Sequence, residues 1–307
     1  MKKMDKNRLF AGITLPILSA FMVLITAIFF TSCLERQSIS LPLIADYDSD
    51  MVREERKNLK IGVVPGPYGD LYLEIIQPLL AANGYTAELV HYNDFIRPNF
   101  ALAEYETDLN IFQHYQYLNN FKLENDLDLS AIAEIPTVSM GIFSSRYRSL
   151  NALGNGITVS IPNDSTNRSR ALRVLNAANV ITLNPAADMA RVDIIDIVSN
   201  PRNLRFIQLD AQALVNSLDS VGLSVINGNF AIAGGLNPSA ALYNEVLAEG
   251  YVNLIAVRTE DLDNQFVRDI IDVVRSDIYI DMVIDVNGKY SGFQRPRYFF
   301  DILGKRR

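Results

Sequence analysis

The sequence is poor in the residue types on which most enzymes and metal sites depend. Among its 307 residues it has one cysteine, two histidines and no tryptophan. A single cysteine cannot form a disulfide within the chain. Neither His91 nor His114 stands at a metal-ligand spacing from the cysteine or from a carboxylate. These absences argue against a metal centre, a bound cofactor and a cysteine- or histidine-based enzyme.

Positive charge is also scarce. Lysine and arginine number 28 against 35 aspartates and glutamates, which gives a formal net charge of −7. Because the first 33 residues carry a net +3, the remainder of the chain carries −10. Proteins that bind nucleic acid need clustered lysine and arginine against the phosphates. The charge balance therefore argues against a nucleic-acid partner.

No glycine-rich phosphate loop is present either. Gly62, Gly66 and Gly69 follow an apolar run, but their spacing matches neither of the common nucleotide-binding motifs. These glycines are expected to form a turn. The acidic pair Asp193 and Asp196 is typical of a solvated helix face, so the sequence offers no catalytic group.

A basic start and a long apolar run occupy the N-terminus. MKKMDKNR is followed by Phe10 to Phe30, which contains no charged residue and is long enough to span a bilayer. The run ends in Phe30-Thr31-Ser32-Cys33, which resembles the lipobox of bacterial lipoproteins. In such proteins the cysteine is lipidated and the signal peptide is removed. We expect residues 1–33 to be a lipoprotein signal peptide with Cys33 as the lipid site; an uncleaved anchor helix is the alternative, and both place the rest of the chain outside the cytoplasm.

Residues 34–58 are polar and charge-mixed, which predicts a flexible tether. From Leu59 onward, apolar runs of strand type alternate with runs of helical spacing. They are LKIGVV, LYLEIIQPLLAANG, TAELVHY, PNFALAEYE and LNIF. This βαβαβ order predicts a parallel sheet covered by helices. Pro78 should kink the first helix.

The same order begins again in the middle of the chain. The second set is ITVSI, RALRVLNAA, LRFIQL, LVNSL and LSVIN. Two such units predict an α/β protein of two lobes. Open α/β sheets bind ligands beyond the carboxyl ends of their strands, so polar turns at those ends are candidate sites.

The turn in IPNDSTNRSRAL, residues 161–172, is more polar than a simple connection requires. It leads into a helix expected from Arg170 onward, and the free N–H groups of a helix start favour an anion. Arg170 can present a planar fork to a carboxylate. The alternative is plain capping by Asp164, Ser165 or Thr166, with Arg170 exposed to solvent.

Two further turns are candidates. VINGNFA places Asn227 and Asn229 after an apolar strand, where an amide oxygen can accept from an ammonium group; a tight Asn-Gly turn is the alternative. NIFQHYQYL brings together Phe112, His114 and Tyr117, which suit a small, partly apolar ligand but also suit an ordinary core.

Several long motifs occur in a recognisable order between Leu59 and Arg258. They are LKIGVVPGP, NDFIRPNFALAEYETDLNIFQHYQYL, SSRYRSL, IPNDSTNRSRAL, NPRNLRFIQLDAQALVNSLD, VINGNFA and YVNLIAVRTED. This series resembles the methionine-binding lipoproteins of bacterial ABC importers, the NlpA-type family. The resemblance implies a two-lobed, periplasmic-binding-protein-like (type II) α/β fold, each lobe a mostly parallel sheet with flanking helices. It implies a first lobe of 59–139 and 251–307, and a second of 140–250.

The resemblance also implies a function. The protein would capture an amino acid, most readily L-methionine, and deliver it to an ABC permease and its ATPase without catalysis or a cofactor. Arg170 would bind the α-carboxylate with Asn167 beside it, and Asn227 the α-amino group. The side-chain pocket would be walled by Phe95, Phe112, His114 and Tyr117. The alternatives are another apolar or D-amino acid, a short methionine-containing peptide, or a surface lipoprotein that mainly binds a partner protein.

Three positions depart from the family pattern. The family commonly has tyrosine in place of Phe95, and proline in place of Ser165 and Gln116. The first change removes a hydroxyl from the pocket wall, and the other two remove stiff residues from its turns. The resemblance therefore leaves ligand preference open.

Overall fold

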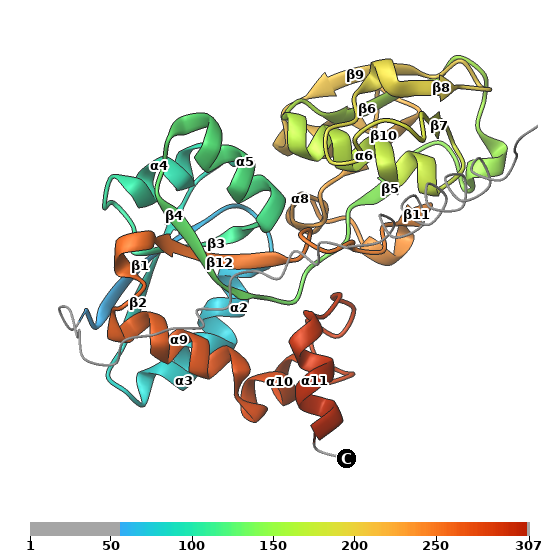
Figure 1. The fold of residues 1–307 in the computed structure, drawn as a ribbon. Helices are drawn as coiled ribbons and strands as arrows, with labels where there is room; N and C mark the ends of the chain where they lie inside the picture. Colours follow the sequence, from blue (N-terminus) through green and yellow to red (C-terminus); the bar gives the residue numbers. More distant parts are fainter. Residues whose placement is uncertain (1–55, 306–307) are drawn as a thin grey trace, which may run out of the picture. The chain divides into compact units, whose positions relative to one another are not determined.

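The structure, a computed structural model, describes residues 56–305. They form two five-stranded sheets, flanking helices and a two-stranded ribbon (Figure 1). The expected signal peptide, Cys33 and most of the expected tether lie outside the described residues, so the expectations for them stay predictions. Within residues 56–305, no helix has both the length and the apolar character needed to cross a bilayer.

The first sheet has the strand order β2-β1-β3-β12-β4. Its strands are β1 (Asn58–Val63), β2 (Thr86–His91), β3 (Leu109–His114), β4 (Leu129–Glu134) and β12 (Asn253–Arg258). β1 pairs in parallel with β2 and β3, whereas β12 pairs antiparallel with both β3 and β4. Four strands therefore run in one direction, and the late strand β12 opposes them.

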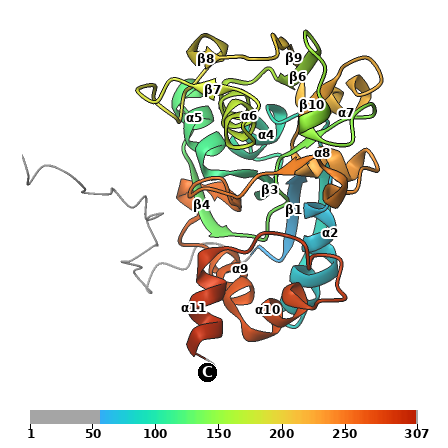
Figure 2. The same cartoon turned by 90° about the vertical axis from the view of Figure 1, so that its right-hand side faces the viewer.

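Side chains of β12 alternate between the two faces of this sheet, as the strand period of two requires. Leu254 and Ala256 pack with Leu102 and Leu118 of the helices on one face, whereas Ile255 and Val257 join the larger core on the other. The helices of the first face are α4 (Arg97–Ala103) and α5 (Tyr115–Asn125). The larger core is covered by α2 (Tyr68–Leu71), α3 (Gln77–Ala81), α9 (Gln265–Arg275), α10 (Asp277–Ile284) and α11 (Arg297–Lys305), most of which Figure 2 shows together below the sheet. Both faces are thus covered, as expected for a mostly parallel sheet.

The helical segment that contains Pro78 changes its hydrogen-bond pattern along its length. A π-helical turn, η1 (Tyr72–Ile76), follows α2 directly and leads into α3, and Pro78 lies in the first turn of α3. Proline has no N–H to donate to the preceding turn of the helix. The π-helical turn thus lies directly before the proline, and the kink expected there stays a prediction.

The second sheet has the order β11-β5-β10-β6-β9. Its strands are β5 (Gly141–Phe143), β6 (Thr158–Pro162), β9 (Arg205–Leu209), β10 (Leu223–Ile226) and β11 (Tyr243–Asn244). β6 pairs in parallel with β9 and β10, and β5 pairs antiparallel with β10 and β11. Again four strands share a direction and one opposes them.

Helices cover both faces of the second sheet as well. Val159, Ile161 and Val225 pack with Leu172 and Leu175 of α6 (Ser165–Ala177), while Phe143 and Ile226 pack with α7 (Leu214–Ser217) and α8 (Gly228–Ala233). The ribbon consists of β7 (Thr182–Leu183) and β8 (Ile197–Ser199). Short 3-10 turns lie at η2 (Leu150–Ala152), η3 (Ile194–Asp196), η4 (Ala211–Ala213), η5 (Pro238–Ala240) and η6 (Thr259–Asp261).

Two segments connect the sheets: residues 135–140 lead from β4 to β5, and residues 245–252 lead from β11 to β12. Gln294, near the C-terminus, contacts both. Its backbone exchanges two hydrogen bonds with Thr137, at 2.9 and 2.8 Å. Its side-chain amide donates to Ser139 and, at 2.7 Å, to the carbonyl of Glu245. The C-terminal region thus holds the two connections together.

In each sheet the opposing strand is the one that enters from the other lobe, β12 in the first and β5 in the second. The prediction of a two-lobed, periplasmic-binding-protein-like (type II) α/β fold with a mostly parallel sheet in each lobe is confirmed.

Candidate ligand-binding site

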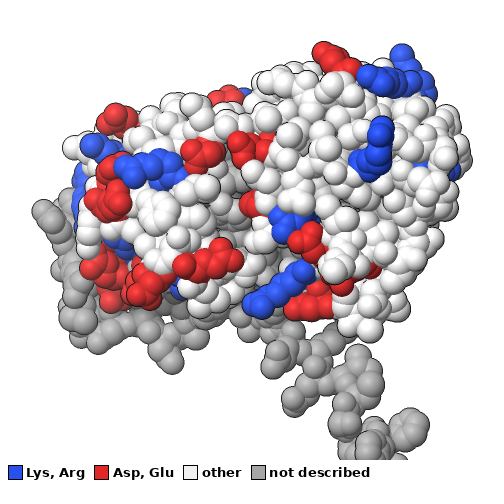
Figure 3. All heavy atoms as spheres, turned by 90° about the horizontal axis from the view of Figure 1, so that it is seen from above, with Lys and Arg blue, Asp and Glu red and all other residues white. Residues whose placement is uncertain are grey.

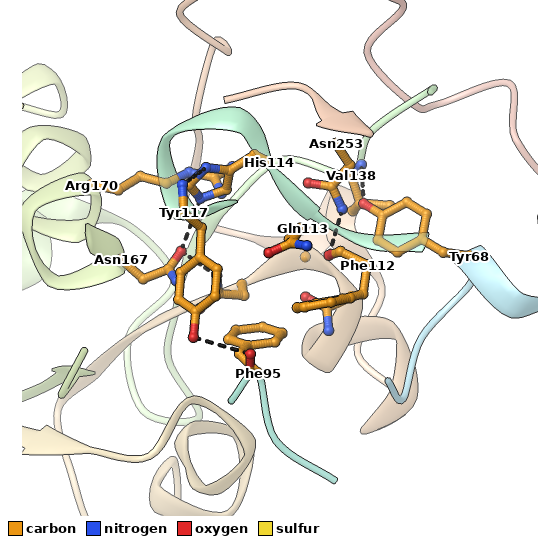
Figure 4. Close-up of a pocket in the computed structure, with 13 residues that line it drawn as sticks. Tyr68, Phe95, Phe112, Gln113, His114, Tyr117, Val138, Asn167, Arg170 and Asn253 are labelled. Carbon is orange, nitrogen blue, oxygen red and sulfur yellow. Dashed lines mark hydrogen bonds between the residues drawn. The ribbon is translucent and has the colours of Figure 1, made fainter. Parts of the chain in front are cut away.

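A cavity that is partly open to solvent lies where the two lobes meet, and residues from both line it (Figure 4). The seven residues predicted to bind a ligand are all in its wall: Phe95, Phe112, His114, Tyr117, Asn167, Arg170 and Asn227. Four come from the first lobe: Phe95 from the loop between β2 and α4, and the others from β3 and the start of α5. Three come from the starts of α6 and α8 in the second lobe. The structure therefore brings together every predicted site residue; the role of each toward a ligand stays a prediction.

Aromatic rings form one wall of the cavity. Phe95 lies 5.9 Å from Phe112 and 5.8 Å from Tyr117, centroid to centroid. It also lies 5.0 Å from Phe230 of α8, in the other lobe. The Tyr117 hydroxyl donates to the carbonyl of Phe95 at 3.1 Å. This hydrogen bond links α5 to the loop that carries Phe95, at the apolar end of the cavity.

Helix α6 begins earlier than the sequence predicts. It starts at Ser165, five residues before the expected start at Arg170, because the carboxylate of Asp164 accepts from the N–H of Asn167 at 2.8 Å. The alternative of capping is therefore correct for Asp164, and its carboxylate occupies the anion position at this helix start. That alternative also left Arg170 in solvent, which is wrong because Arg170 is only 3% exposed.

The Asp164 carboxylate orients a chain of side chains that reaches the cavity. The side-chain N–H₂ of Asn167 donates to it at 3.1 and 3.2 Å, so the oxygen of Asn167 faces the other way. That oxygen accepts from the side-chain N–H₂ of Asn227 at 2.8 Å and lies 3.4 Å from Nε2 of His114. Burial raises the pKa of Asp164, while its hydrogen bonds with Asn167 oppose the rise. An ionised carboxylate only accepts, so it fixes which way each amide points.

Asn227 is left with an unsatisfied acceptor as a result. Its Oδ1 is buried and has no hydrogen-bond partner within residues 56–305. Such a group costs about 1–3 kcal/mol unless something donates to it. Asn227 stands at the N-cap position of α8 but makes no capping bond with its side chain. The side chain of Asn227 therefore lines the cavity and does not cap the helix.

His114 is held in a single neutral form. Its Nδ1 accepts from the backbone N–H of Tyr117 at 3.2 Å and so caps α5. Burial, together with the nearby Arg170, lowers the pKa of His114 well below its usual value. The ring is therefore uncharged at neutral pH, and its proton lies on Nε2, from which it faces the oxygen of Asn167.

Arg170 makes a buried ion pair with Glu245. Its Nε lies 3.0 Å from both carboxylate oxygens of Glu245, and its Nη2 lies 2.6 Å from Oε2. The side chains are 4% and 9% exposed. Burial opposes the charged form of Arg170, but Glu245 outweighs it and leaves the pKa of Arg170 raised. Glu245 has no counterpart among the residues predicted from the sequence.

A profile of the NlpA lipoprotein family matches residues 59–296. The chain belongs to the NlpA lipoprotein family. The D-methionine-binding lipoprotein MetQ of Escherichia coli K12 is 32% identical over 228 residues, which cover 73% of this chain and 83% of that protein.

Two solved structures of similar proteins match the fold. A nutrient-binding protein from Burkholderia cenocepacia, bound to methionine, is 30% identical with a TM-score of 0.70, covering 76% of this chain and 97% of its own. An ABC-transporter periplasmic substrate-binding protein from Coxiella burnetii is 30% identical with a TM-score of 0.71, covering 78% and 100%. The fold of residues 56–305 thus agrees with that of substrate-binding proteins.

The cavity wall of this NlpA-family protein also contains Asn229, which the polar turn VINGNFA offered as a candidate together with Asn227. It includes five residues that the sequence did not predict: Tyr68, Gln113, Val138, Gly228 and Asn253. For Tyr68 the sequence shows no sign of a binding role, because the glycines around it predict only a turn. In the structure Tyr68 is the first residue of α2. Its hydroxyl accepts from the N–H of Val138 at 3.2 Å, and burial raises its pKa to about 12, so it keeps a proton to donate.

Contacts across the cavity join the two lobes. The side chain of Asn120 donates to Thr166 at 3.0 Å, and that of Asn229 donates to the carbonyl of Pro65 at 3.0 Å. Gly66 has a φ of +135°, and a Cβ there would lie 2.7 Å from the Cβ of Asn229. Only glycine fits this close approach.

One departure from the family pattern has a visible consequence. The backbone N–H of Gln116 donates to the carbonyl of Gly250 at 3.0 Å. Proline could not make this bond. Gln116 therefore ties the start of α5 to the second connecting segment.

Metal binding and nucleic-acid binding gain no support. Within the described residues, no group of three histidine, cysteine, aspartate or glutamate side chains is placed to hold a metal ion. On the face shown in Figure 3, basic and acidic side chains are interspersed rather than gathered by sign. Polar and aromatic groups around a cavity instead suit a small organic ligand.

Proposed function

We propose that this protein is the substrate-binding lipoprotein of an ABC importer and that it captures L-methionine in the cavity. The observation that carries this proposal is the unsatisfied oxygen of Asn227 in a cavity wall that also contains Arg170. The side-chain N–H₂ of Asn227 is bonded to Asn167, which precedes Arg170 by one turn of α6. An acceptor and a cation on one side of a cavity match the ammonium and carboxylate groups that share one carbon atom in an amino acid. Relatives that are named for binding D-methionine, and one that was solved with methionine bound, support methionine as the ligand.

Both charged ends of the ligand find partners in this arrangement. The ammonium group donates to Oδ1 of Asn227, and the carboxylate meets the part of the Arg170 guanidinium that Glu245 does not use. A zwitterion is costly to desolvate unless both ends are paired. The site is therefore selective for free α-amino acids.

The aromatic wall selects the side chain. Phe95, Phe112 and Tyr117 surround the apolar end of the cavity. A thioether sulfur beside an aromatic ring contributes about 0.3–1.5 kcal/mol, which a purely aliphatic side chain lacks. This favours methionine over leucine.

Ligand binding closes the lobes, which we place at 59–139 with 251–307, and at 140–250. The carboxylate and ammonium partners belong to the second lobe, whereas most of the aromatic wall belongs to the first. A ligand that contacts both gains interactions only in the closed state, and so favours it. The role is capture and delivery to a permease and its ATPase, with no chemical step.

The chain is held at the cell membrane, facing the periplasm or exterior, by a lipid on Cys33. If so, Cys33→Ala leaves the precursor uncleaved and unlabelled by palmitate in metabolic labelling. Normal palmitate incorporation in that variant would refute the lipid site, and an uncleaved anchor helix predicts that the substitution changes nothing.

A thermal-shift screen of refolded Leu34–Arg307 against the amino acids tests the function. A ligand at 100 times its Kd stabilises the folded state by about 2.7 kcal/mol. We expect the largest shift with L-methionine, with D-methionine screened beside it because the E. coli relative is named for that enantiomer. A larger shift with D-methionine would reassign the enantiomer. No shift with any amino acid would favour a protein-interaction role.

A further inference from the structure

Glu245 lies just after β11, on the connecting segment that leads back to the first lobe, and its carboxylate faces Arg170. The contacts are all on one edge of the guanidinium, the edge formed by Nε and Nη2. No hydrogen bond from Nη1 is found within residues 56–305. Arg170 itself is part of the cavity wall.

A guanidinium has five N–H donors in one plane. Glu245 takes those on the Nε–Nη2 edge, which leaves three: one on Nη2 and two on Nη1. Nη1 and Nη2 together form a second edge, and that edge can make two parallel bonds to another carboxylate. One arginine can thus hold two carboxylates at once, side by side.

The carboxylate of Glu245 is itself firmly held. Its Oε2 accepts from the N–H of Met140 at 3.2 Å, and its own N–H donates to the carbonyl of Met140 at 2.9 Å. Its carbonyl accepts from Gln294 at 2.7 Å. A side chain fixed by two connecting segments gives the guanidinium a fixed orientation.

We infer that Glu245 is a positioning residue for ligand recognition: it holds one edge of Arg170 so that the other edge faces the cavity and grips the ligand's carboxylate. The inference rests on the proposed function, because it requires a ligand with a carboxylate at Arg170. Glu245 itself touches no ligand in this arrangement.

Neutralising Glu245 is expected to change the affinity for the ligand in the direction opposite to that expected from electrostatic attraction alone. Removing a negative charge beside Arg170 would by Coulomb's law strengthen its attraction for an anion. Positioning by Glu245 predicts the reverse, because a guanidinium released from Glu245 loses its fixed orientation toward the ligand. Displacement of Glu245 by the ligand's carboxylate, the competing arrangement, predicts tighter binding once Glu245 is neutralised.

The test is calorimetry on Glu245→Gln with two ligands, L-methionine and L-methioninol, in which an alcohol replaces the carboxylate. We expect L-methionine to bind the variant at least tenfold more weakly, with L-methioninol changed by less than twofold. Equal or tighter binding of L-methionine would overturn the inference. Equal weakening of both ligands would also overturn it, because that pattern indicates general damage to the fold.

A matched control exists on the same helix. Asp193 binds the Nε–Nη2 edge of Arg168 at 3.0 and 2.7 Å, in the same edge-on manner, but this pair is not part of the cavity wall. Asp193→Asn should leave the affinity for both ligands unchanged. A loss equal to that of Glu245→Gln would show that any broken ion pair on α6 weakens binding, which contradicts a special role for Glu245.

Glu245→Asp keeps the test decisive if the glutamine variant does not fold. It retains the charge but withdraws the carboxylate by one methylene, so L-methionine should bind at least threefold more weakly and L-methioninol equally well. Unchanged L-methionine binding would overturn the inference. Failure of the proposed function is separate: it appears as wild-type protein that does not bind L-methionine. Wild-type protein that binds L-methioninol as tightly as L-methionine would overturn the inference, because the carboxylate would then not be recognised.

Discussion

At the scale of single residues, Asn227 and Arg170 are expected to affect the affinity for the ligand differently from the stability of the fold. The Oδ1 of Asn227 is a buried acceptor without a hydrogen-bond partner within residues 56–305, a cost to folding that the ammonium group of the proposed ligand would remove. Arg170 is buried beside a glutamate that neutralises it, and so remains available to a ligand without being an isolated buried charge.

Asn227→Ala should weaken L-methionine binding at least tenfold, because a hydrogen bond to a charged group contributes about 1.5–3 kcal/mol. The melting temperature of the ligand-free protein should change little, since the substitution also removes the unsatisfied oxygen. Calorimetry and thermal melting check the two expectations together.

Asn200→Ala is the control for this experiment. Both polar groups of Asn200 are bonded to Leu204, at 3.0 and 2.9 Å, and it is not part of the cavity wall. Its loss should lower the melting temperature and leave affinity unchanged. The same profile in the two variants would contradict a ligand role for Asn227.

Arg170→Ala should weaken L-methionine binding at least tenfold, and about a hundredfold or more if two charge-assisted bonds are lost. Arg170→Lys keeps the charge but not the fork, so it should fall between. Arg168→Ala is the control, because Arg168 pairs with Asp193 at 2.7 Å and is not part of the cavity wall. Calorimetry that found both alanine variants equally affected, or neither, would show that Arg170 does not clamp the carboxylate.

At the scale of elements, the starts of α5 and α6 form the polar part of the site. His114 caps α5 and Asp164 caps α6, and both side chains meet at Asn167. The capping groups of two helices therefore also orient the amides that line the cavity. A change at either cap should alter stability and binding together.

His114 gives this arrangement a pH dependence. Its pKa is lowered in the folded protein, so below about pH 6.5 the unfolded chain takes up a proton that the folded protein does not. This lowers the free energy of unfolding by up to about 1.4 kcal/mol per pH unit as the pH falls. The charged groups that oppose protonation here are Arg170 and Arg173.

His114→Asn keeps a capping side chain for α5 but has no titrating ring. Urea unfolding at pH 7.5 and 5.5 should show a smaller loss of stability in this variant than in the wild type. Equal losses in the two proteins would show that His114 does not stay neutral in the folded state.

Most of the helices and strands were predictable from the sequence, because period-two and helical patterns identify these elements wherever one face is buried. The sequence placed the start of α6 too late because Ser165 to Ser169 are all polar. A helix that begins among polar residues shows no apolar periodicity in its first turn. Glu245 was not predictable, since its partner lies 75 residues away and only the fold brings them together. Tyr68 and Asn253 were also missed. Each begins a helix or strand, and nothing in the neighbouring sequence indicates that its side chain reaches a cavity.

At the scale of the whole molecule, the two connecting segments and the residues that bind across the cavity control closure. Gln294 joins the connections, while Asn120, Asn229 and Phe95 contact the opposite lobe. These contacts are few and polar or aromatic, so a ligand that fills the cavity between them can shift the lobes toward the closed state.

The most direct test is calorimetry of Leu34–Arg307, unfolded and refolded to remove any retained ligand, with L-methionine and L-leucine. The two amino acids share their charged ends, so the difference between their affinities isolates the aromatic wall and its preference for sulfur. We predict that L-methionine binds at least tenfold more tightly than L-leucine. Equal affinities, or no binding of L-methionine, would contradict the assignment.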